Sequence, residues 1–155
     1  MTPAIRAAEK AKIKFAIREY RHDPRAESYG LEAAAALGVP VEHVFKTLIV
    51  KLDTRELVVA LIPVHKSLDL KMLASVLGVK KAEITEVAEA ERATGYVTGG
   101  ISPLGQRKRL RTVADVSILQ LDQVYVSAGR RGMDLALHPS DLLRLCEAIT
   151  APIAR

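Results

Sequence analysis

The chain has 155 residues, of which 49% are hydrophobic and 26% charged, with a formal net charge of +5. These values fit a soluble globular domain with a real core and exclude a disordered or fibrous chain. A single cysteine, Cys146, excludes an internal disulfide, and the absence of tryptophan among few aromatics argues against stacking of successive single-stranded bases. The modest positive charge favours a polyanionic partner.

The first third of the chain predicts helix, strand and helix in that order. Residues 2–10 are expected to form a helix with Thr2 as its cap. Apolar and polar residues alternate over 13–17, which is typical of a half-buried strand. After a polar loop, the alanine-rich stretch 31–37 predicts a helix that Gly38 ends.

The middle of the chain predicts a hairpin followed by short helices. Residues 45–52 and 57–62 are apolar and rich in β-branched side chains, so we expect two antiparallel strands that are buried on both faces. A helix is predicted over 69–77 and a second one over 86–93. A short strand is expected over 96–98.

The last part of the chain predicts three strands and a closing helix. The strands are expected over 112–116, 123–127 and 133–137, with a turn at 128–132. Ser140 is expected to cap the final helix. Its apolar stripe is predicted to contain Leu142, Leu145, Cys146 and Ile149. The whole order predicts one mixed α/β domain of α+β type with a mixed sheet.

No targeting or membrane-spanning segment is predicted. The N-terminal residues carry charges at Arg6, Glu9, Lys10 and Lys12 without an apolar stretch, so they do not resemble a signal peptide. The longest apolar run, 57–64, is too short to span a bilayer. Together with the single cysteine, these features predict a cytoplasmic protein.

The segment 95–111 combines glycines, a proline and a basic end. Gly99 and Gly100 are adjacent and allow the backbone to approach a ligand closely, and Pro103 stiffens the chain after them. The following cations, Arg107 among them, would attract phosphate groups. The pattern fits a small pocket with a basic rim, and it also fits a surface hairpin with a solvated basic end.

The sequence contains no conventional catalytic nucleophile. The four histidines have no metal-ligand spacing. Cys146 lies on the apolar stripe of the predicted helix, where a cysteine usually acts as a small hydrophobic residue. Ser102 lacks the Gly-x-Ser-x-Gly pattern, and no phosphate loop or dinucleotide fingerprint is present. An enzyme built from this chain would use positioned water or a nucleophile carried by its substrate.

Lys46 is the most informative single residue. It opens the apolar strand 45–52, where its ammonium could pair with a phosphate or polarise a carbonyl. It could also simply reach water at the strand end. Ser127 and Asp134 flank the predicted turn and could face the same cleft or be solvated turn residues. The residues alone leave both interpretations open.

Three motifs carry a resemblance to a known family. They are Lys46-Thr47-Leu48, Thr-Gly-Tyr-x-x-Gly-Gly-Ile-Ser-Pro-Leu-Gly at 94–105, and Tyr-Val-Ser-x-Gly-x-Arg-Gly-x-Asp at 125–134. Together they resemble the YbaK-type Cys-tRNA(Pro) deacylases of the bacterial prolyl-tRNA editing superfamily. The resemblance covers nearly the whole chain. It implies one editing domain over 1–155, with a mixed curled sheet or barrel-like core packed by helices, and it favours a pocket over a surface hairpin.

The resemblance implies hydrolytic proofreading. Prolyl-tRNA synthetase mischarges tRNA(Pro) with cysteine, and a protein of this family removes it, with Cys-tRNA(Cys) as a further substrate. The cysteinyl thiol is implied to attack its own ester, which agrees with the missing nucleophile. The implied partners are tRNA and prolyl-tRNA synthetase, without cofactor or metal. Editing of Ala-tRNA(Pro) and a non-catalytic module that binds tRNA or a synthetase stay open as alternatives.

The resemblance also implies site residues. Lys46 would anchor the terminal adenosine phosphate or orient the ester, and the backbone at Gly99, Gly100 and Ile101 would hold the carbonyl and its developing charge. Asp134 would bind the α-amino group. The other residues implied to bind substrate are Tyr20, Thr47, Ser102, Pro103, Ser127 and Gly129. The cations implied to steer tRNA are Arg107, Lys108, Arg109, Arg130 and Arg131.

Overall fold

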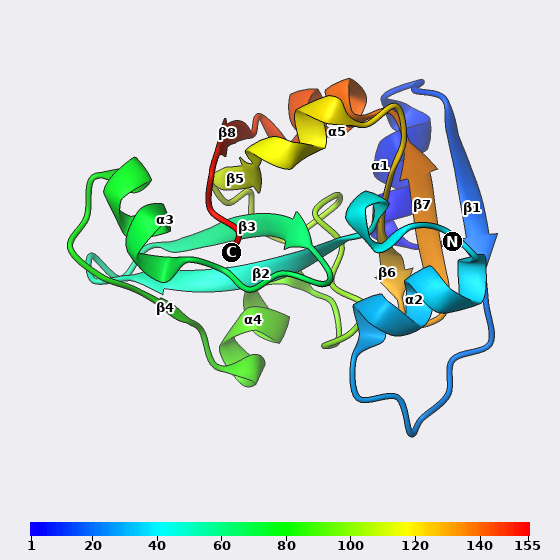
Figure 1. Ribbon diagram of the computed structural model, residues 1–155, viewed down its shortest axis with the longest axis horizontal. Helices are drawn as coiled ribbons and strands as arrows, with labels where there is room; N and C mark the ends of the chain where they lie inside the picture. The colour runs from blue at the N-terminus through cyan, green and yellow to red at the C-terminus, as the bar shows by residue number, and fades with distance from the viewer.

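The computed structural model describes residues 1–155 and contains two β-sheets and five α-helices (Figure 1). The smaller, antiparallel sheet has the order β1-β7-β6, with β1 (Phe15–Glu19), β6 (Val124–Arg130) and β7 (Met133–Leu137). The larger sheet has the order β4-β2-β3-β5-β8. Its strands are β2 (Phe45–Leu52), β3 (Leu57–Pro63), β4 (Ala82–Ile84), β5 (Thr112–Asp115) and β8 (Ile149–Ala151). Because β3–β5 and β5–β8 are parallel and the other pairs antiparallel, the predicted mixed α/β fold is confirmed.

The two sheets meet at one point. A parallel bridge joins Val44, just before β2, to Tyr125 on β6. Figure 1 shows the smaller sheet at one end of the molecule and the β2–β3 hairpin extending toward the other. The predicted curled sheet or barrel-like core is thus built from two sheets, and β2 runs from one toward the other.

Four of the five helices lie within two residues of their predicted bounds, and the fifth, at the C-terminus, differs. They are α1 (Pro3–Lys10), α2 (Tyr29–Leu37), α3 (Leu70–Leu77), α4 (Val87–Thr94) and α5 (Pro139–Cys146), with short 3₁₀ helices at Val41–His43 and Val116–Gln120. The side chains of Thr2, Ser28 and Asp69 accept backbone N–H groups at the starts of α1, α2 and α3. Left-handed Gly38 and Gly78 end α2 and α3. None of these helices has the length and apolar character needed to cross a bilayer.

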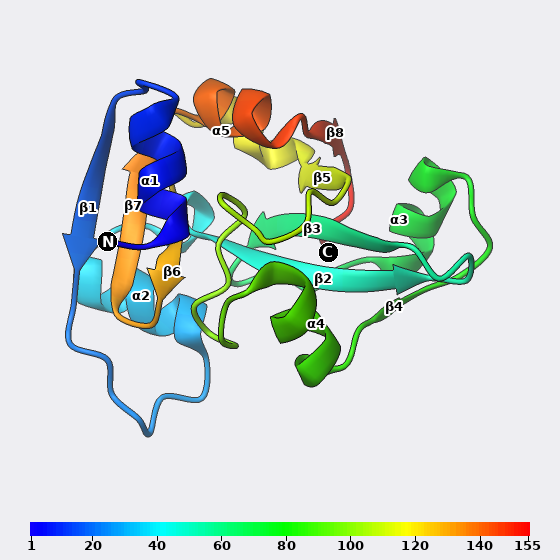
Figure 2. The same ribbon diagram turned by 180° about the vertical axis from the view of Figure 1, so that it is seen from behind.

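The predicted hairpin forms the centre of the core. β3 is buried almost throughout, and alternate residues of β2 and β3 enter two different clusters. Phe45 and Ile49 pack with the smaller sheet and α1, whereas Val50 and Leu52 pack under α3. Figure 2 shows α1 lying over β6 and β7. This double burial explains why both strands are apolar on both faces.

Two predictions in the glycine-rich parts of the chain are wrong. Residues 96–98 do not form a strand, because the Tyr96 hydroxyl donates to the Leu104 carbonyl (2.6 Å) and the Gly100 N–H donates to the Val97 carbonyl (2.8 Å), which folds the segment into a loop. The turn predicted at 128–132 is shorter than expected. β6 continues to Arg130 through a bulge after Ser127, which takes up the extra residues.

The C-terminal prediction also needs correction. The cap of α5 is His138, whose Nδ1 accepts the Ser140 N–H (3.1 Å), so Ser140 lies inside the helix. Left-handed Glu147 ends the helix, and Ile149 begins β8 with 51% of its surface exposed. Ile149 therefore does not continue the apolar stripe of α5. The strands β4 and β8 were not predicted because three residues are too few to show a period.

Candidate active site

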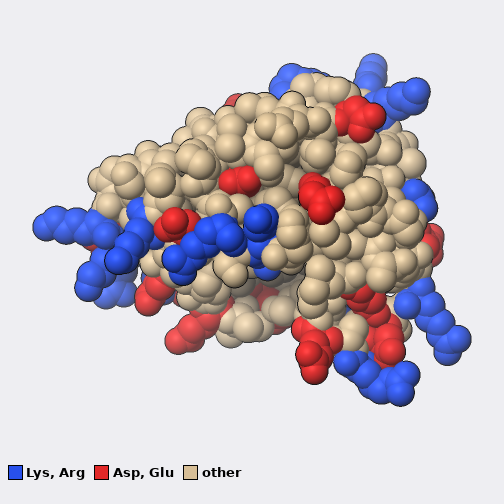
Figure 3. Space-filling model, viewed as in Figure 1, with Lys and Arg blue, Asp and Glu red and all other residues tan.

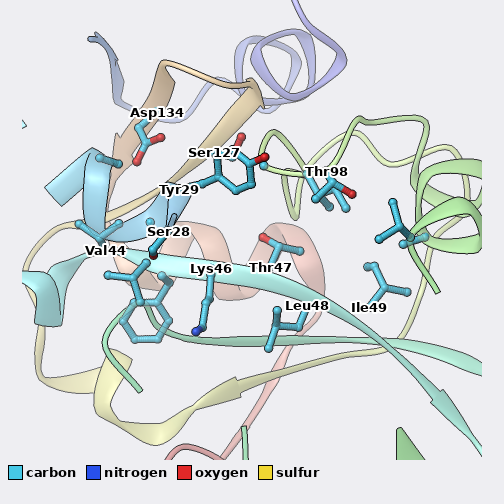
Figure 4. A pocket seen from close by; sticks show the side chains of 18 of the residues that line it. Ser28, Tyr29, Val44, Lys46, Thr47, Leu48, Ile49, Thr98, Ser127 and Asp134 are labelled. Atoms are coloured by element: carbon cyan, nitrogen blue, oxygen red, sulfur yellow. The ribbon is translucent and has the colours of Figure 1, made fainter. Parts of the chain in front are cut away.

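A cavity of about 370 Å³ lies where the two sheets meet (Figure 4). Its size is within the range of small-molecule sites. The start of β2, the start of α2, the loop after α4, and the β6–β7 hairpin all contribute to its wall. The predicted site residues that line it are Tyr20, Lys46, Thr47, Gly99, Ile101, Ser127 and Asp134. Residues from four distant parts of the sequence therefore share one cavity.

Asp134 is a buried carboxylate without a protein partner. It lies on β7 directly opposite Ser127 on β6, and only 5% of its surface is exposed. No side chain or backbone N–H donates to its carboxylate, and burial alone raises its pKa from 3.8 to about 6. Burial and the nearby charge of Asp134 also raise the pKa of Tyr20 to about 12. A bound cation would offset the desolvation of Asp134.

The alternation of β2 separates Lys46 from Thr47. Figure 4 shows Thr47 on the side of β2 that faces Ser127 and Thr98, whereas Lys46 extends from the other side. The Thr47 hydroxyl is buried and has no hydrogen-bond partner. Burial lowers the pKa of the Lys46 ammonium. Thr47 thus offers an unused donor and acceptor to the cavity, and Lys46 offers a partly desolvated charge at its border.

Two residues of the glycine loop that line the cavity have unbonded backbone donors. Neither the Gly99 N–H nor the Ile101 N–H donates to another protein group, and both residues line the cavity. The Gly100 N–H is already bonded to the Val97 carbonyl. Gly100 instead allows close packing, since a Cβ there would lie 2.7 Å from the Cα of Arg130. Two of the three predicted backbone positions therefore have free N–H groups.

Three residues of the predicted substrate site lie outside the cavity wall. Ser102 is fully buried, and its hydroxyl accepts the Leu104 N–H (3.3 Å). The Pro103 carbonyl faces the thiol of Cys146 (3.6 Å). Gly129 has a left-handed φ of 109° and packs against Tyr96, with its N–H donated to the Ser127 hydroxyl (3.1 Å). These residues shape the loop and the bulge that carry the cavity-lining groups.

The predicted tRNA-steering cations differ in how their side chains are paired. Arg107 donates to the Arg92 carbonyl, and Arg109 donates to the Leu145 carbonyl and pairs with Glu147. Lys108 and Arg130 make no side-chain hydrogen bond or ion pair, whereas Arg131 contacts the edge of the cavity. On the face in Figure 3, Lys and Arg side chains stand in separate groups with Asp and Glu among them.

Sequence reasoning missed the walls contributed by α2 and by the start of α4. Tyr29 and Gly30 of α2 line the cavity, and a Cβ on Gly30 would lie 2.3 Å from the Val64 side chain, so α2 sits tightly on the end of β3. Ile84 at the end of β4 and Val87 at the start of α4 also line the cavity and are 51% and 57% exposed. Exposed apolar residues beside a cavity signal a binding surface only once the fold is known.

Known proteins resemble this chain in sequence and in fold. A family model described as the aminoacyl-tRNA editing domain matches residues 23–145. An Enterococcus faecalis protein, described as a candidate Cys-tRNA(Pro)/Cys-tRNA(Cys) deacylase named EbsC, is 36% identical over 98% of this chain and 92% of its own. An Escherichia coli protein named as the multifunctional Ser/Thr-tRNA deacylase ProXp-y is 31% identical over 58% of this chain and 54% of its own.

A solved structure supports the fold independently. The crystal structure of a candidate trans-editing enzyme for prolyl-tRNA synthetase superposes with a TM-score of 0.85 at 23% identity, covering 100% of this chain and 99% of that one. The family model spans most of the chain, including Lys46, Gly99 and Asp134. The chain belongs to the aminoacyl-tRNA editing domain family.

Proposed function

We propose that this protein deacylates Cys-tRNA(Pro), with Cys-tRNA(Cys) as a second substrate. The observation that carries the proposal is a cavity whose wall contains both the unpaired Asp134 carboxylate and two residues with unbonded backbone N–H groups, Gly99 and Ile101. An aminoacyl ester has the complementary groups, namely an α-ammonium and a carbonyl that becomes an oxyanion. The 36% identity to a candidate deacylase of this specificity supports the choice of cysteine.

Different groups of the site are proposed to bind the aminoacyl ester and the terminal nucleotide of the substrate. Asp134 binds the α-ammonium, and the N–H groups of Gly99 and Ile101 bind the carbonyl oxygen as negative charge develops. The Thr47 hydroxyl bonds the aminoacyl group or the ribose. Lys46, on the other side of β2, pairs with the phosphate of the terminal nucleotide.

The substrate thiol supplies the nucleophile. The cavity wall contains no cysteine or histidine, and Cys146 lies elsewhere with its pKa raised to about 12 by burial. The cysteinyl sulfur forms a bond to the ester carbonyl carbon while the bond from that carbon to the ribose oxygen breaks. The thiol proton moves to the ribose oxygen, through water or a protein group. The products are free tRNA and a cyclic thiolactone.

Selection of tRNA is proposed to involve both charge and a partner. The unpaired cations Lys108 and Arg130 attract the phosphate backbone, which carries little sequence information. We therefore propose that prolyl-tRNA synthetase supplies most of the tRNA selectivity, and that the protein works in the cytoplasm. Residues 1–155 are proposed to act as one editing domain, because α1 packs on β6 and β8 pairs with β5.

A panel of charged tRNAs tests the proposal. Initial deacylation rates are measured for Cys-tRNA(Pro), Cys-tRNA(Cys), Ser-tRNA(Pro) and Ala-tRNA(Pro) under single-turnover conditions. The two cysteinyl esters should react much faster than the others, since only they carry a thiol. Equal rates for cysteine and serine would indicate enzyme-activated water. Binding of tRNA without ester loss would indicate a non-catalytic module.

A further inference from the structure

Charged side chains hold both sides of the residue that precedes Gly99. The Thr98 N–H donates to Oε2 of Glu91 (2.8 Å), and the Thr98 carbonyl accepts from Nε of Arg131 (2.8 Å). Glu91 comes from α4 and Arg131 from the turn between β6 and β7. Hydrogen bonds to charged groups are shorter and stronger than neutral ones. Two side chains of opposite charge, from two different elements, therefore hold the backbone of Thr98 in place.

Arg131 is itself held in place. Its guanidinium carbon lies 4.9 Å from the ring centroid of Tyr29, at the start of α2. Gly99 packs directly against both side chains, since a Cβ on Gly99 would lie 2.9 Å from Nε of Arg131 and 3.0 Å from the Tyr29 ring. Gly99 also has a left-handed φ of 88°. This close contact leaves the guanidinium little freedom to leave the loop.

The Thr98 carbonyl and the Gly99 N–H are the two ends of one peptide group. A cationic donor on the carbonyl polarises that peptide and strengthens its N–H as a donor, as in other chains of hydrogen bonds. The Gly99 N–H has no protein acceptor, and Gly99 lines the cavity. The charge of Arg131 thus acts on a group that is free to bond a ligand.

We propose that Arg131 is a positioning residue for ester cleavage. Its bond to the Thr98 carbonyl orients and polarises the Gly99 N–H toward the developing oxyanion, and Glu91 fixes the other side of Thr98. The inference rests on the proposed deacylase function. It gives Arg131 a role inside the site, which differs from the steering of tRNA by surface charge.

The kinetic test compares Arg131→Gln with Arg144→Gln. Arg144 is an exposed arginine on α5 that pairs with Asp141 and lies outside the cavity and the proposed tRNA contacts. Loss of an oxyanion donor lowers kcat by about 100- to 1000-fold, so weakening one should lower kcat by roughly tenfold or more. We expect R131Q to show this loss on Cys-tRNA(Pro) with KM within about twofold, whereas R144Q matches the parent. A raised KM with unchanged kcat in R131Q would assign Arg131 to phosphate binding and overturn the proposal.

A spectroscopic test separates this role from general damage and from the proposed function. In ¹⁵N-labelled protein, R131Q should move the Gly99 amide proton upfield while resonances of the β2–β3 hairpin stay in place. Glu91→Gln keeps an acceptor for the Thr98 N–H and should cause a smaller change. An unchanged Gly99 resonance in R131Q would refute the polarisation. This readout needs no substrate, so it holds even if the wild-type protein fails to cleave Cys-tRNA(Pro).

Discussion

The cavity and the basic segment 107–111 differ in how their polar groups are paired. In the cavity, the Asp134 carboxylate and the Thr47 hydroxyl are buried without partners. In the basic segment, Arg109 pairs with Glu147 and Arg111 forms a bidentate pair with Glu56. Exposed pairs of this kind contribute little to stability, whereas unpaired buried groups lower it.

This difference indicates where a ligand is required. A fold that leaves a carboxylate and a hydroxyl unsatisfied in one cavity carries a cost that a bound substrate can offset. The basic segment carries no such cost, because most of its charges already have partners within the protein. Cavity variants should therefore change chemistry without lowering stability, whereas variants of unpaired surface cations should change only the encounter with tRNA.

The largest effect is expected for Lys46→Ala. Loss of a charged group that contacts the terminal phosphate or the ester should lower kcat/KM for Cys-tRNA(Pro) by about 100-fold or more. Because burial already lowers the pKa of Lys46, removing its ammonium should not lower the melting temperature. Lys66→Ala, outside the cavity wall, serves as the matched control. A folded K46A protein with near-normal turnover would remove Lys46 from the site.

The second-largest loss of activity is expected for Asp134→Asn. This variant should lose activity without losing stability. Losing the carboxylate that binds the ammonium should lower kcat/KM by about 30-fold or more at pH 7.5. The folded-state pKa of about 6 lies above the ordinary 3.8, so the wild-type protein loses up to about 3 kcal/mol of unfolding free energy as pH rises from about 4 through 6. D134N cannot ionise and should not show this loss.

The pH dependence of kcat/KM is a second measurement of the ionisation of Asp134. Wild-type kcat/KM should rise as Asp134 ionises near pH 6, and D134N should lack this rise. Initial rates at constant ionic strength, together with melting curves at each pH, provide both measurements. An identical rising limb in the variant would assign the titration to another group.

A smaller effect is expected for Thr47→Val, which keeps the shape of the side chain. The unbonded hydroxyl should contribute roughly tenfold to kcat/KM if it bonds the substrate. Its removal should leave the unfolding free energy unchanged or raise it by up to about 1 kcal/mol, because a buried unsatisfied group is lost. Urea unfolding and single-turnover kinetics test both. A clear loss of stability would show that the hydroxyl has an internal role.

The smallest effect is expected outside the cavity, for Lys108→Gln. One lost phosphate contact should raise KM by a few-fold at low salt, with kcat preserved, and the difference should shrink as salt screens the charge. KM is compared with that of the parent at several salt concentrations. A salt-independent drop in kcat would contradict a steering role.

Local signals in the sequence predict much of this fold. Capping residues such as Thr2 and Asp69 and the terminal glycines placed three of the helices, because capping is decided within a few residues. The β2–β3 hairpin followed from its apolar, β-branched composition. The strands β4 and β8 could not be predicted, because three residues are too few to show a period and only pairing with β2 and β5 makes them strands.

The candidate site was only partly predictable. The family motifs pointed to Lys46, Thr47 and Asp134, which the fold brings to one cavity. The contacts that hold Thr98 join α2, α4 and the β6–β7 turn, and no local pattern reveals them. That Asp134 has no partner is likewise a property of the packed structure. The sequence motifs identify which residues belong to the site, whereas only the folded structure shows which of their polar groups lack a hydrogen-bond partner.

Direct titration of Asp134 tests whether this carboxylate binds the α-ammonium of the substrate. The carboxyl ¹³C resonance of Asp134 is followed against pH in free protein and with a non-hydrolysable cysteinyl amide of 3′-amino-adenosine. We expect a pKa of about 6 in the free protein and a fall to 3.8 or below with the analogue bound. A pKa that stays near 6 in the bound state would contradict this role of Asp134.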